Sequence, residues 1–523
     1  MNKLTKINIL KDVPLSNSYE HTIYFDNLTS QVSYFTSLAK FNLTNYSYQR
    51  VRKGTIRVGL VADKLYDCNY LMFQNSSYGN KWFYAFITSC DYVNDETSEL
   101  TFEIDVMQTW MFDYNLQRCF VQREHAVSDD LTNLQPEPVN LGEPVLNKLA
   151  DSNPDGYKAL LDLNTMCIIF NTIDQTQVSE GGGVFDGVYG AGVLTAFNTD
   201  DLDGIKAFLT TFAQKTDNII SVYMCPRAII ASTIESGGTK LTSTQISKHV
   251  DVNLPTAGTL ESVGGYIPKN KKLFTYPYNY IVLSNASGDS LTLRYEYFTD
   301  YRPQIRVNGC VTQPVQIVAR PRNYKNAVEC YSEGLSLGNF PMCSWAIDGY
   351  QAYIAQTAIP ALGGMALNML ATAGMVLVGG ATAGEVTLQS TASSTLNNIS
   401  NLIVGGYKAS VGNDISRGNF NTGNANVSMG TNQLYWGRMS VSAHYAEVID
   451  NFFDMFGYAT NRVKTPNTHS RPHWNYVKTQ GCIAKGSVPA SDMRKICDIY
   501  DQGITFWKNG SELGNYSLDN RPS

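Results

Sequence analysis

Two apolar runs joined by a turn decide the fold of this chain. They are Trp82-Phe-Tyr-Ala-Phe-Ile-Thr-Ser-Cys-Asp-Tyr92 and Leu100-Thr-Phe-Glu-Ile-Asp-Val-Met107. Both runs are rich in aromatic and β-branched residues, which favour strands. Between them lies Asn94-Asp-Glu-Thr-Ser98, whose Asn and Asp residues favour a tight turn. The pattern therefore predicts an antiparallel hairpin.

The same pattern continues toward the N-terminus. Strand-like runs occur at Val58–Ala62 and Tyr66–Phe73, and Ser77–Asn80 supplies a second turn signal. The stretch Ser128–Pro144 is polar and contains prolines, which is typical of a domain boundary. We therefore expect a β-rich N-terminal domain over residues 1–144.

Residues 145–345 predict a separate mixed domain. Thr199 or Asp200 can cap a helix. The apolar face of this helix is formed by Leu202, Ile205, Phe208, Leu209 and Phe212. Strands are expected at Met166–Asn171, Ile219–Met224, Tyr276–Leu283 and Ser290–Tyr297. The last two flank Asn285–Gly288, a further hairpin turn.

The segment 349–407 contains a single charged residue, Glu385. Its run Ala358–Gly384 exceeds the roughly 20 apolar residues that a membrane-spanning helix needs. However, Pro360 and several glycines lower its hydrophobicity. The second half, Val386–Val404, keeps a helical period above a Ser/Thr/Asn face. Two helices joined near the glycines would form a long apolar hairpin, and a buried core hairpin or a single membrane anchor is the alternative.

Asn413–Asn432, rich in Gly, Asn and Ser, is predicted to be a mobile connector, so residues 346–435 form one region. Residues 436–523 return to regular structure. Apolar positions predict a helix that Gly457 ends: Val441, Tyr445, Val448, Ile449, Phe452 and Phe456. A strand at Asn475–Val477, a helix at Ser491–Tyr500 and a strand at Ile504–Trp507 follow. The predicted fold class is mainly β, of the α+β kind.

Composition excludes several classes of protein. The net charge is −6, and high-affinity nucleic-acid binding needs clustered Lys and Arg. The densest basic groups are Arg50, Arg52, Lys53 and Arg57, and Lys269, Lys271 and Lys272, which we expect to be solvated. The N-terminus has no apolar run typical of an export signal. The ten cysteines include no Cys-x-x-Cys pair, so we expect synthesis in a reducing cytoplasm and no disulfide framework.

The sequence predicts no catalytic residues, no cofactor and no metal site. The glycine-rich loop Glu180–Gly192 lacks the Gly-Lys-Ser/Thr ending of a phosphate-binding loop. Pro472 breaks any helix that could place His469 and His473 on one face. Glu103 and Asp105 are expected on one side of a strand. A solvated strand face or a salt link between subunits is a simpler interpretation of these two residues than a catalytic pair.

Several segments resemble the tail-knob protein family of small short-tailed phages, the phi29-like group. In the N-terminal part these are Phe73–Phe86, Phe102–Asp113 and Val121–His125. Near the C-terminus they are Asn461–Lys464, Trp474–Thr479, Asp501–Trp507 and Gly514–Ser517. The similarity thus brackets the chain, whereas residues 145–345 resemble the family little beyond Tyr276–Tyr278.

The resemblance implies a virion structural protein that forms a hexameric ring at the tail tip. Both chain ends would build a β-rich tube domain, residues 1–144 with residues 436–523, and residues 145–345 would be an inserted knob domain. The apolar loop would close the lumen before infection and then form a pore in the host cytoplasmic membrane for genome ejection. Implied partners are other copies of the chain, the adjacent upper-collar or connector-side tail protein, membrane lipid, and double-stranded DNA that passes through without specific binding.

On this interpretation the chain is made in the host cytoplasm, resides in the virion tail and inserts its loops during entry. The membrane-active residues would be Ile359, Leu362, Met365, Leu367, Met369, Leu370, Met375, Val376, Leu377, Val378, Gly380 and Gly384. Glu385 would make insertion sensitive to pH, because protonation lowers the cost of burying a carboxylate.

Two other classes of function stay open. A receptor-binding tail adhesin for host cell-wall glycan could share the β-rich, Tyr- and Asn-rich composition without any membrane activity. A wall-degrading enzyme would need a carboxylate pair in a groove, and Glu103 with Asp105 is the nominal candidate.

Overall fold

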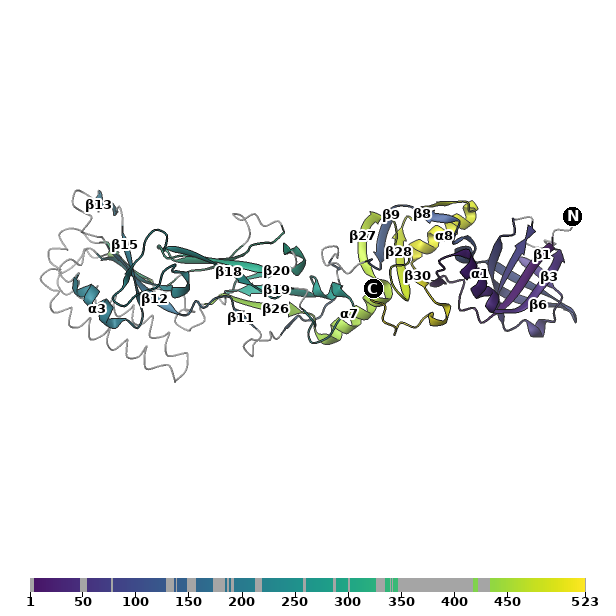
Figure 1. Ribbon diagram of the computed structural model, residues 1–523, viewed down its shortest axis with the longest axis horizontal. Helices are drawn as coiled ribbons and strands as arrows, with labels where there is room; N and C mark the ends of the chain where they lie inside the picture. The colour runs from purple at the N-terminus through teal and green to yellow at the C-terminus, as the bar shows by residue number, and fades with distance from the viewer. Residues whose placement is uncertain are drawn as a thin grey trace. The chain divides into compact units, whose positions relative to one another are not determined.

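The computed structural model describes most of the chain outside the apolar segment. The described residues are 4–47, 54–76, 79–127, 136–137, 139–147, 157–172, 184–185, 188–189, 192–211, 219–256, 260–285, 288–299, 302–325, 334–338, 340, 342–346, 417–421 and 433–522. These residues form several antiparallel sheets and a few helices (Figure 1), which confirms the mainly β fold class. Within this part of the chain, no helix combines the length and the apolar character needed to span a bilayer.

The chain divides into two compact units. The first contains residues 1–143, 261–278 and 441–523, and the second contains residues 144–260 and 279–440. The first unit therefore combines both ends of the chain with a short internal segment.

The N-terminal sheet of the first unit has the order β3-β1-β5-β6-β7-β4. Its strands are β1 (Leu4–Lys11), β3 (Ala39–Ser47), β4 (Thr55–Val58), β5 (Cys68–Asn75), β6 (Trp82–Asn94) and β7 (Thr97–Ile104), with helix α1 (Leu28–Ser37) inserted after β2 (His21–Ile23). Strands β6 and β7 pair from Ala85 with Ile104 to Asn94 with Thr97. The predicted hairpin is thus confirmed, with its turn at Asp95 and Glu96.

Two strand boundaries near this hairpin were predicted wrongly. Strand β7 ends at Ile104, because the Asp105 side chain accepts hydrogen bonds from the backbone N–H groups of Met107 and Gln108. These bonds start helix α2 (Val106–Trp110), so Met107 is helical. Likewise, the expected strand Val58–Ala62 ends already at Val58, and a short 3-10 helix, η1 (Ala62–Lys64), follows.

A second sheet of the first unit interleaves both chain ends in the order β2-β30-β28-β9-β27. Its remaining elements are β9 (Cys119–Glu124), β27 (Tyr458–Lys464), β28 (Trp474–Gln480) and β30 (Ile504–Trp507), with helices α7 (Ala443–Phe456) and α8 (Ala490–Gln502) and a small sheet of β8 (Tyr114–Leu116) with β29 (Ala484–Gly486). Strand β9 lies between β28 and β27 (Figure 1). One core cluster accordingly contains Phe35 and Tyr70 together with Val477 and Ile496.

The second unit contains a sheet of order β17-β15-β12-β16-β24-β25. Its strands are β12 (Met166–Thr172), β15 (Val193–Asn198), β16 (Ile219–Pro226), β17 (Thr239–Lys240), β24 (Met342–Ala346) and β25 (Arg417–Asn421). Helix α3 (Leu202–Thr211) packs on it through Ile205, Phe208 and Leu209, as its apolar pattern predicted. Its cap is not Thr199 or Asp200 but Asp201, whose Oδ1 accepts the Gly204 N–H at 3.1 Å.

Two further large sheets complete this unit. One has the order β10-β26-β19-β20, with β11 also paired to β26. Its strands are β10 (Val145–Leu146), β11 (Lys158–Ala159), β19 (Asn279–Ser284), β20 (Ser290–Leu293) and β26 (Tyr435–Ser440). The other has the order β18-β21-β22-β23, formed by β18 (Ser247–Asn253), β21 (Gln304–Cys310), β22 (Gln316–Pro321) and β23 (Leu335–Leu337). The short strands β13 (Val184–Phe185) and β14 (Val188–Tyr189) pair with each other as a separate two-stranded sheet.

Candidate functional site

The residues predicted to contact lipid, from Ile359 to Gly384, and Glu385 lie outside the described residues. Their role therefore stays a prediction. The structure instead describes the two strands that flank this segment, β24 before it and β25 after it.

These flanking strands form the base of the apolar segment. Strand β24 pairs antiparallel with β25, from Met342 opposite Asn421 to Ala346 opposite Arg417. On its other side β24 pairs with β16, for example Ser344 with Ser221. Ala346 and Arg417, which precede and follow residues 347–416 in the sequence, are therefore register partners at the same end of one strand pair. Backbone hydrogen bonds hold both ends of the segment at neighbouring positions.

Strand β25 corrects the prediction that Asn413–Asn432 is a mobile connector throughout. Its sequence, Arg417-Gly-Asn-Phe-Asn421, contains no β-branched residue and three residues that disfavour strands, Gly418, Asn419 and Asn421, so local propensity gave little signal. The strand forms because β24 offers it a partner far away in the sequence. Pairing of this kind depends on tertiary context, which a local pattern does not contain.

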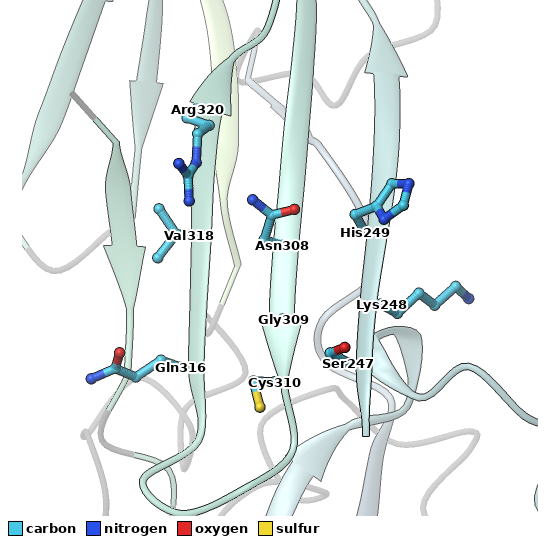
Figure 2. Close-up of a pocket in the computed structure, with 9 residues that line it drawn as sticks. All are labelled: Ser247, Lys248, His249, Asn308, Gly309, Cys310, Gln316, Val318 and Arg320. Carbon is cyan, nitrogen blue, oxygen red and sulfur yellow. The ribbon is translucent and has the colours of Figure 1, made fainter. Parts of the chain in front are cut away.

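A second candidate is a polar depression on the sheet of β18, β21 and β22 (Figure 2). On one face of these strands Ile305, Val307 and Ile317 are buried. The alternate positions point to the other face, where register places Asn308 between His249 and Val318. The depression has a volume of about 380 Å³ and is lined by Ser247, Lys248, His249, Asn308, Gly309, Cys310, Gln316, Val318 and Arg320.

The chemistry of this depression is that of a hydrogen-bonding surface. The amides of Asn308 and Gln316, the Ser247 hydroxyl and the Arg320 guanidinium supply donors and acceptors. No Asp, Glu, Phe, Tyr or Trp residue is among its lining residues, and the His249 imidazole is the one ring there. It therefore offers no carboxylate pair for hydrolysis.

Basic groups dominate the surface beside the depression. The Arg306 guanidinium donates to both oxygens of Asp251, at 2.7 and 2.9 Å, and Arg322 also pairs with this carboxylate. The bond from Arg306 is the main reason that the pKa of Asp251 is lowered. Two guanidinium groups thus share the carboxylate of Asp251 beside the depression.

Glu103 and Asp105 do not form a catalytic pair. Glu103 is half exposed, and its ion pair with Lys495 lowers its pKa. Asp105 is buried, and burial raises its pKa to about 6 although it caps α2 and accepts a hydrogen bond from the Tyr70 hydroxyl at 2.8 Å. The two carboxylates were expected on one strand face, but Asp105 lies beyond the end of the strand and has structural partners.

His469 and His473 also contact different partners. His473 Nδ1 lies 2.9 Å from a Glu512 carboxylate oxygen, whereas the His469 ring stacks on Tyr24 with 5.4 Å between ring centroids. Among the described residues, no group of three or more His, Cys, Asp or Glu side chains could hold a metal ion.

Sequence reasoning missed both the base of the apolar segment and the depression. Each depends on strand register between distant segments, for example Ser247–Asn253 with Gln304–Cys310. The one available signal for the depression was the alternation of apolar and polar residues in Gln304–Cys310 and Gln316–Pro321.

Comparisons with known proteins agree over almost the whole chain. Residues 241–521 match the family described as the C-terminal domain of the Bacillus phage phi29 tail knob protein gp9, and residues 3–115 match the family described as the caudoviral major tail protein N-terminus. The tail knob proteins gp9 of Bacillus phages PZA and phi29 are 28% and 26% identical to this chain, and each match covers 99% of this chain and 98% of the relative.

One solved structure is similar along its full length. It is the bacteriophage C1 tail knob protein, gp12, with a TM-score of 0.64 and 16% sequence identity over 99% of both chains. At this identity the likeness shows a shared fold.

Proposed function

Because this chain belongs to the family of the phi29 tail knob protein gp9, we propose that it forms the distal tube and knob of a short phage tail and carries the element that opens the host cytoplasmic membrane. Family membership makes the chain a structural component of the virion tail and not an enzyme. The proposal goes further in assigning a tube, a closing segment and a pore.

One observation carries the proposal, namely the paired base of the apolar segment. Strands β24 and β25 hold the two residues that flank 347–416, Ala346 and Arg417, opposite each other in the sheet. A segment held in this way can move as a loop while its two ends remain hydrogen-bonded. The base thus supplies the anchored ends that a loop able to change position needs.

The proposal divides the chain into a tube domain, a knob domain and a loop region. Residues 1–144 and 436–523 form the tube domain, residues 145–345 the knob domain, and residues 346–435 the loop region. The interleaving of β9 with β27 and β28 supports a tube domain built from both chain ends. Copies of the chain would assemble as a hexameric ring against the adjacent connector-side tail protein. The net charge of −6 suits a lumen through which DNA slides, because phosphates bind clustered Lys and Arg.

Energetics explain why the loop would be sheltered before infection. Exposing apolar surface to water costs about 25 cal/mol per Å². Two long apolar helices per chain would therefore make a free ring aggregate unless the lumen covers them. Glycines such as Gly380 and Gly384 permit close packing of helices both in the closed tube and in a pore.

Dye release from liposomes tests the membrane role. We expect leakage from assembled wild-type rings and none from rings that lack residues 350–407. The substitution Leu370→Asp should reduce leakage strongly, because a carboxylate at the centre of a membrane helix costs about 2.5–3.5 kcal/mol, whereas Leu370→Met should retain it.

Leakage should rise as the pH falls, and Glu385→Gln should remove that dependence. Equal leakage from intact wild-type and deleted rings would rule out the membrane role.

The polar depression on β18, β21 and β22 favours a second candidate, a tail adhesin that binds host cell-wall glycan. We expect Asn308→Ala to abolish binding on a glycan array if this function is real. The matched control is Asn253→Ala, since Asn253 is exposed on the same strand, β18, and is not among the residues that line the depression. Absence of binding by the wild-type chain, or equal binding by both variants, would remove this candidate.

A further inference from the structure

Two buried thiols face each other across neighbouring strands of the sheet that holds the base of the apolar segment. Cys167 on β12 is the register partner of Cys225 on β16. Both residues are fully buried, and their Sγ atoms lie 3.3 Å apart. This is closer than the roughly 3.5–4.0 Å at which even unbonded carbon atoms pack best.

The backbone geometry at this pair suits a covalent bond. Directly opposed residues of antiparallel strands have Cα atoms about 4.5–5.5 Å apart. A disulfide needs a Cα separation of about 4.4–6.8 Å. Closing the bond therefore requires rotation of the two side chains and no rearrangement of the strands.

The other close thiols in the described chain lack this arrangement. Cys482 interacts with both Cys119 and Cys497. However, the register partner of Cys119 on β27 is Lys464, and Cys497 lies in helix α8. Among the described cysteines, Cys167 and Cys225 are thus the pair that strand register places face to face.

We propose that Cys167 and Cys225 are a latent disulfide, reduced while the chain is made and joined when it meets a disulfide oxidant such as oxidised glutathione. One thiolate attacks the oxidant and releases one glutathione, which gives a mixed disulfide. The second thiol then attacks the protein sulfur and releases the second glutathione. Two protein thiols and one oxidised glutathione thus become one protein disulfide and two reduced glutathione molecules.

Burial determines when the reaction takes place. It raises the pKa of the Cys225 thiol well above its usual value, so the reactive thiolate is rare in the folded sheet. Oxidation therefore proceeds while the chain folds or when β12 and β16 separate. Once formed, the bond is shielded from reductants by the same burial.

The bond would lock the sheet at the place where the apolar segment is anchored. Strand β16 pairs with β12 on one side and with β24 on the other. A bond from β12 to β16 therefore fixes the strand against which the base is built. This consequence rests on the proposed membrane function, whereas the existence of the bond does not.

The test uses the full chain, purified in reductant. One sample is incubated with a glutathione redox buffer under native conditions, and a second is refolded from urea in the same buffer. Free thiols are then alkylated, and the digest is examined by mass spectrometry. We expect a Cys167–Cys225 linked peptide in the refolded sample at least, and a higher urea midpoint than in reductant, because a cross-link restricts the unfolded chain.

Variants separate this bond from the other cysteines. Cys167→Ala and Cys225→Ala should lose the oxidation-dependent shift of the urea midpoint. Cys68→Ala should keep it, because Cys68 is buried but lies opposite Lys11. Alkylated Cys167 and Cys225 in both wild-type samples, or bonding of either residue to a third cysteine, would overturn the proposal. So would an undiminished shift in Cys167→Ala. None of these readouts depends on membrane activity.

Discussion

Replacing Glu137 by alanine should lower the free energy of unfolding of the first unit by about 3–5 kcal/mol. Glu137 is 5% exposed, and its Oε1 accepts hydrogen bonds from Lys272 Nζ at 2.7 Å and from the Ala459 backbone N–H at 2.8 Å. Its Oε2 pairs with the Arg123 guanidinium. Lys272 is fully buried and Arg123 is partly buried, so the substitution leaves two largely desolvated cations without their carboxylate.

The measurement is urea unfolding followed by tryptophan fluorescence. The matched control is Glu99→Ala, which removes the carboxylate of the exposed Arg57–Glu99 pair and should cost less than about 1 kcal/mol. Adding Lys272→Met to Glu137→Ala should restore part of the loss, because it removes one buried charge. Similar losses for Glu137→Ala and Glu99→Ala would contradict the importance of the buried cluster.

This cluster shows where sequence reasoning ends. Glu137 lies in the stretch predicted as a domain boundary, and Lys272 in a basic group predicted to be solvated. The structure corrects the second prediction, since the Lys272 side chain is fully buried and burial lowers its pKa. A long-range ion cluster has no local pattern, because its members come from residues 1–143, 261–278 and 441–523.

The hairpins were predictable because their signals are local. Strands β6 and β7 are rich in aromatic residues, and the short turn between them contains Asn and Asp. Strands β19 and β20 likewise pair on either side of the predicted turn at Asn285–Gly288, where Asn and Gly favour a turn. In both cases register follows from the turn, so the sequence contains nearly all of the information.

Helix α7 was found, but its buried face was predicted only in part: Ile449 is buried, as the pattern indicated. Its apolar residues Tyr445, Val448 and Phe452 are 40%, 55% and 40% exposed. The helix instead buries Phe453 with two carboxylates, Asp450 and Asp454.

The partners of the buried carboxylate of Asp450 explain this face. Asp450 accepts hydrogen bonds from the Lys269 and Asn270 backbone N–H groups and from the Tyr266 hydroxyl. Periodicity ranks positions by apolar character and cannot anticipate such partners. The same limit applies to the candidate site, where the apolar run was evident but its paired base was not.

Lowering the pH should reduce the stability of the folded chain through the buried side chain of His125. This residue is 1% exposed, and both ring nitrogens are engaged. Nδ1 accepts the Tyr476 backbone N–H at 2.8 Å, so Nε2 carries the proton and donates to the Asp454 carbonyl at 3.0 Å. Burial, with Arg471 as the next cause, lowers the pKa of His125 to about 3.

The sign of the pH effect follows from the two states. An unfolded histidine has a pKa of about 6.5, so between this pH and about 3 the unfolded chain binds one proton more than the folded chain. His125 therefore contributes stability above pH 6.5 that is lost as the pH falls, by up to about 1.4 kcal/mol per pH unit. Asp454 acts in the opposite direction, because burial raises its pKa to about 6 and the folded chain takes up its proton first.

His125→Gln isolates the histidine contribution, because glutamine has one donor and one acceptor group but does not titrate. We expect the variant to be less stable than the wild type at pH 7, and the difference in unfolding free energy to shrink steadily from pH 6.5 toward pH 3.5. Urea unfolding at several pH values measures this difference. His249→Gln, at an exposed position of β18, is the matched control. A difference for His125→Gln that is constant with pH would show that the buried imidazole titrates normally. It would then contribute packing and hydrogen bonds but no acid sensitivity.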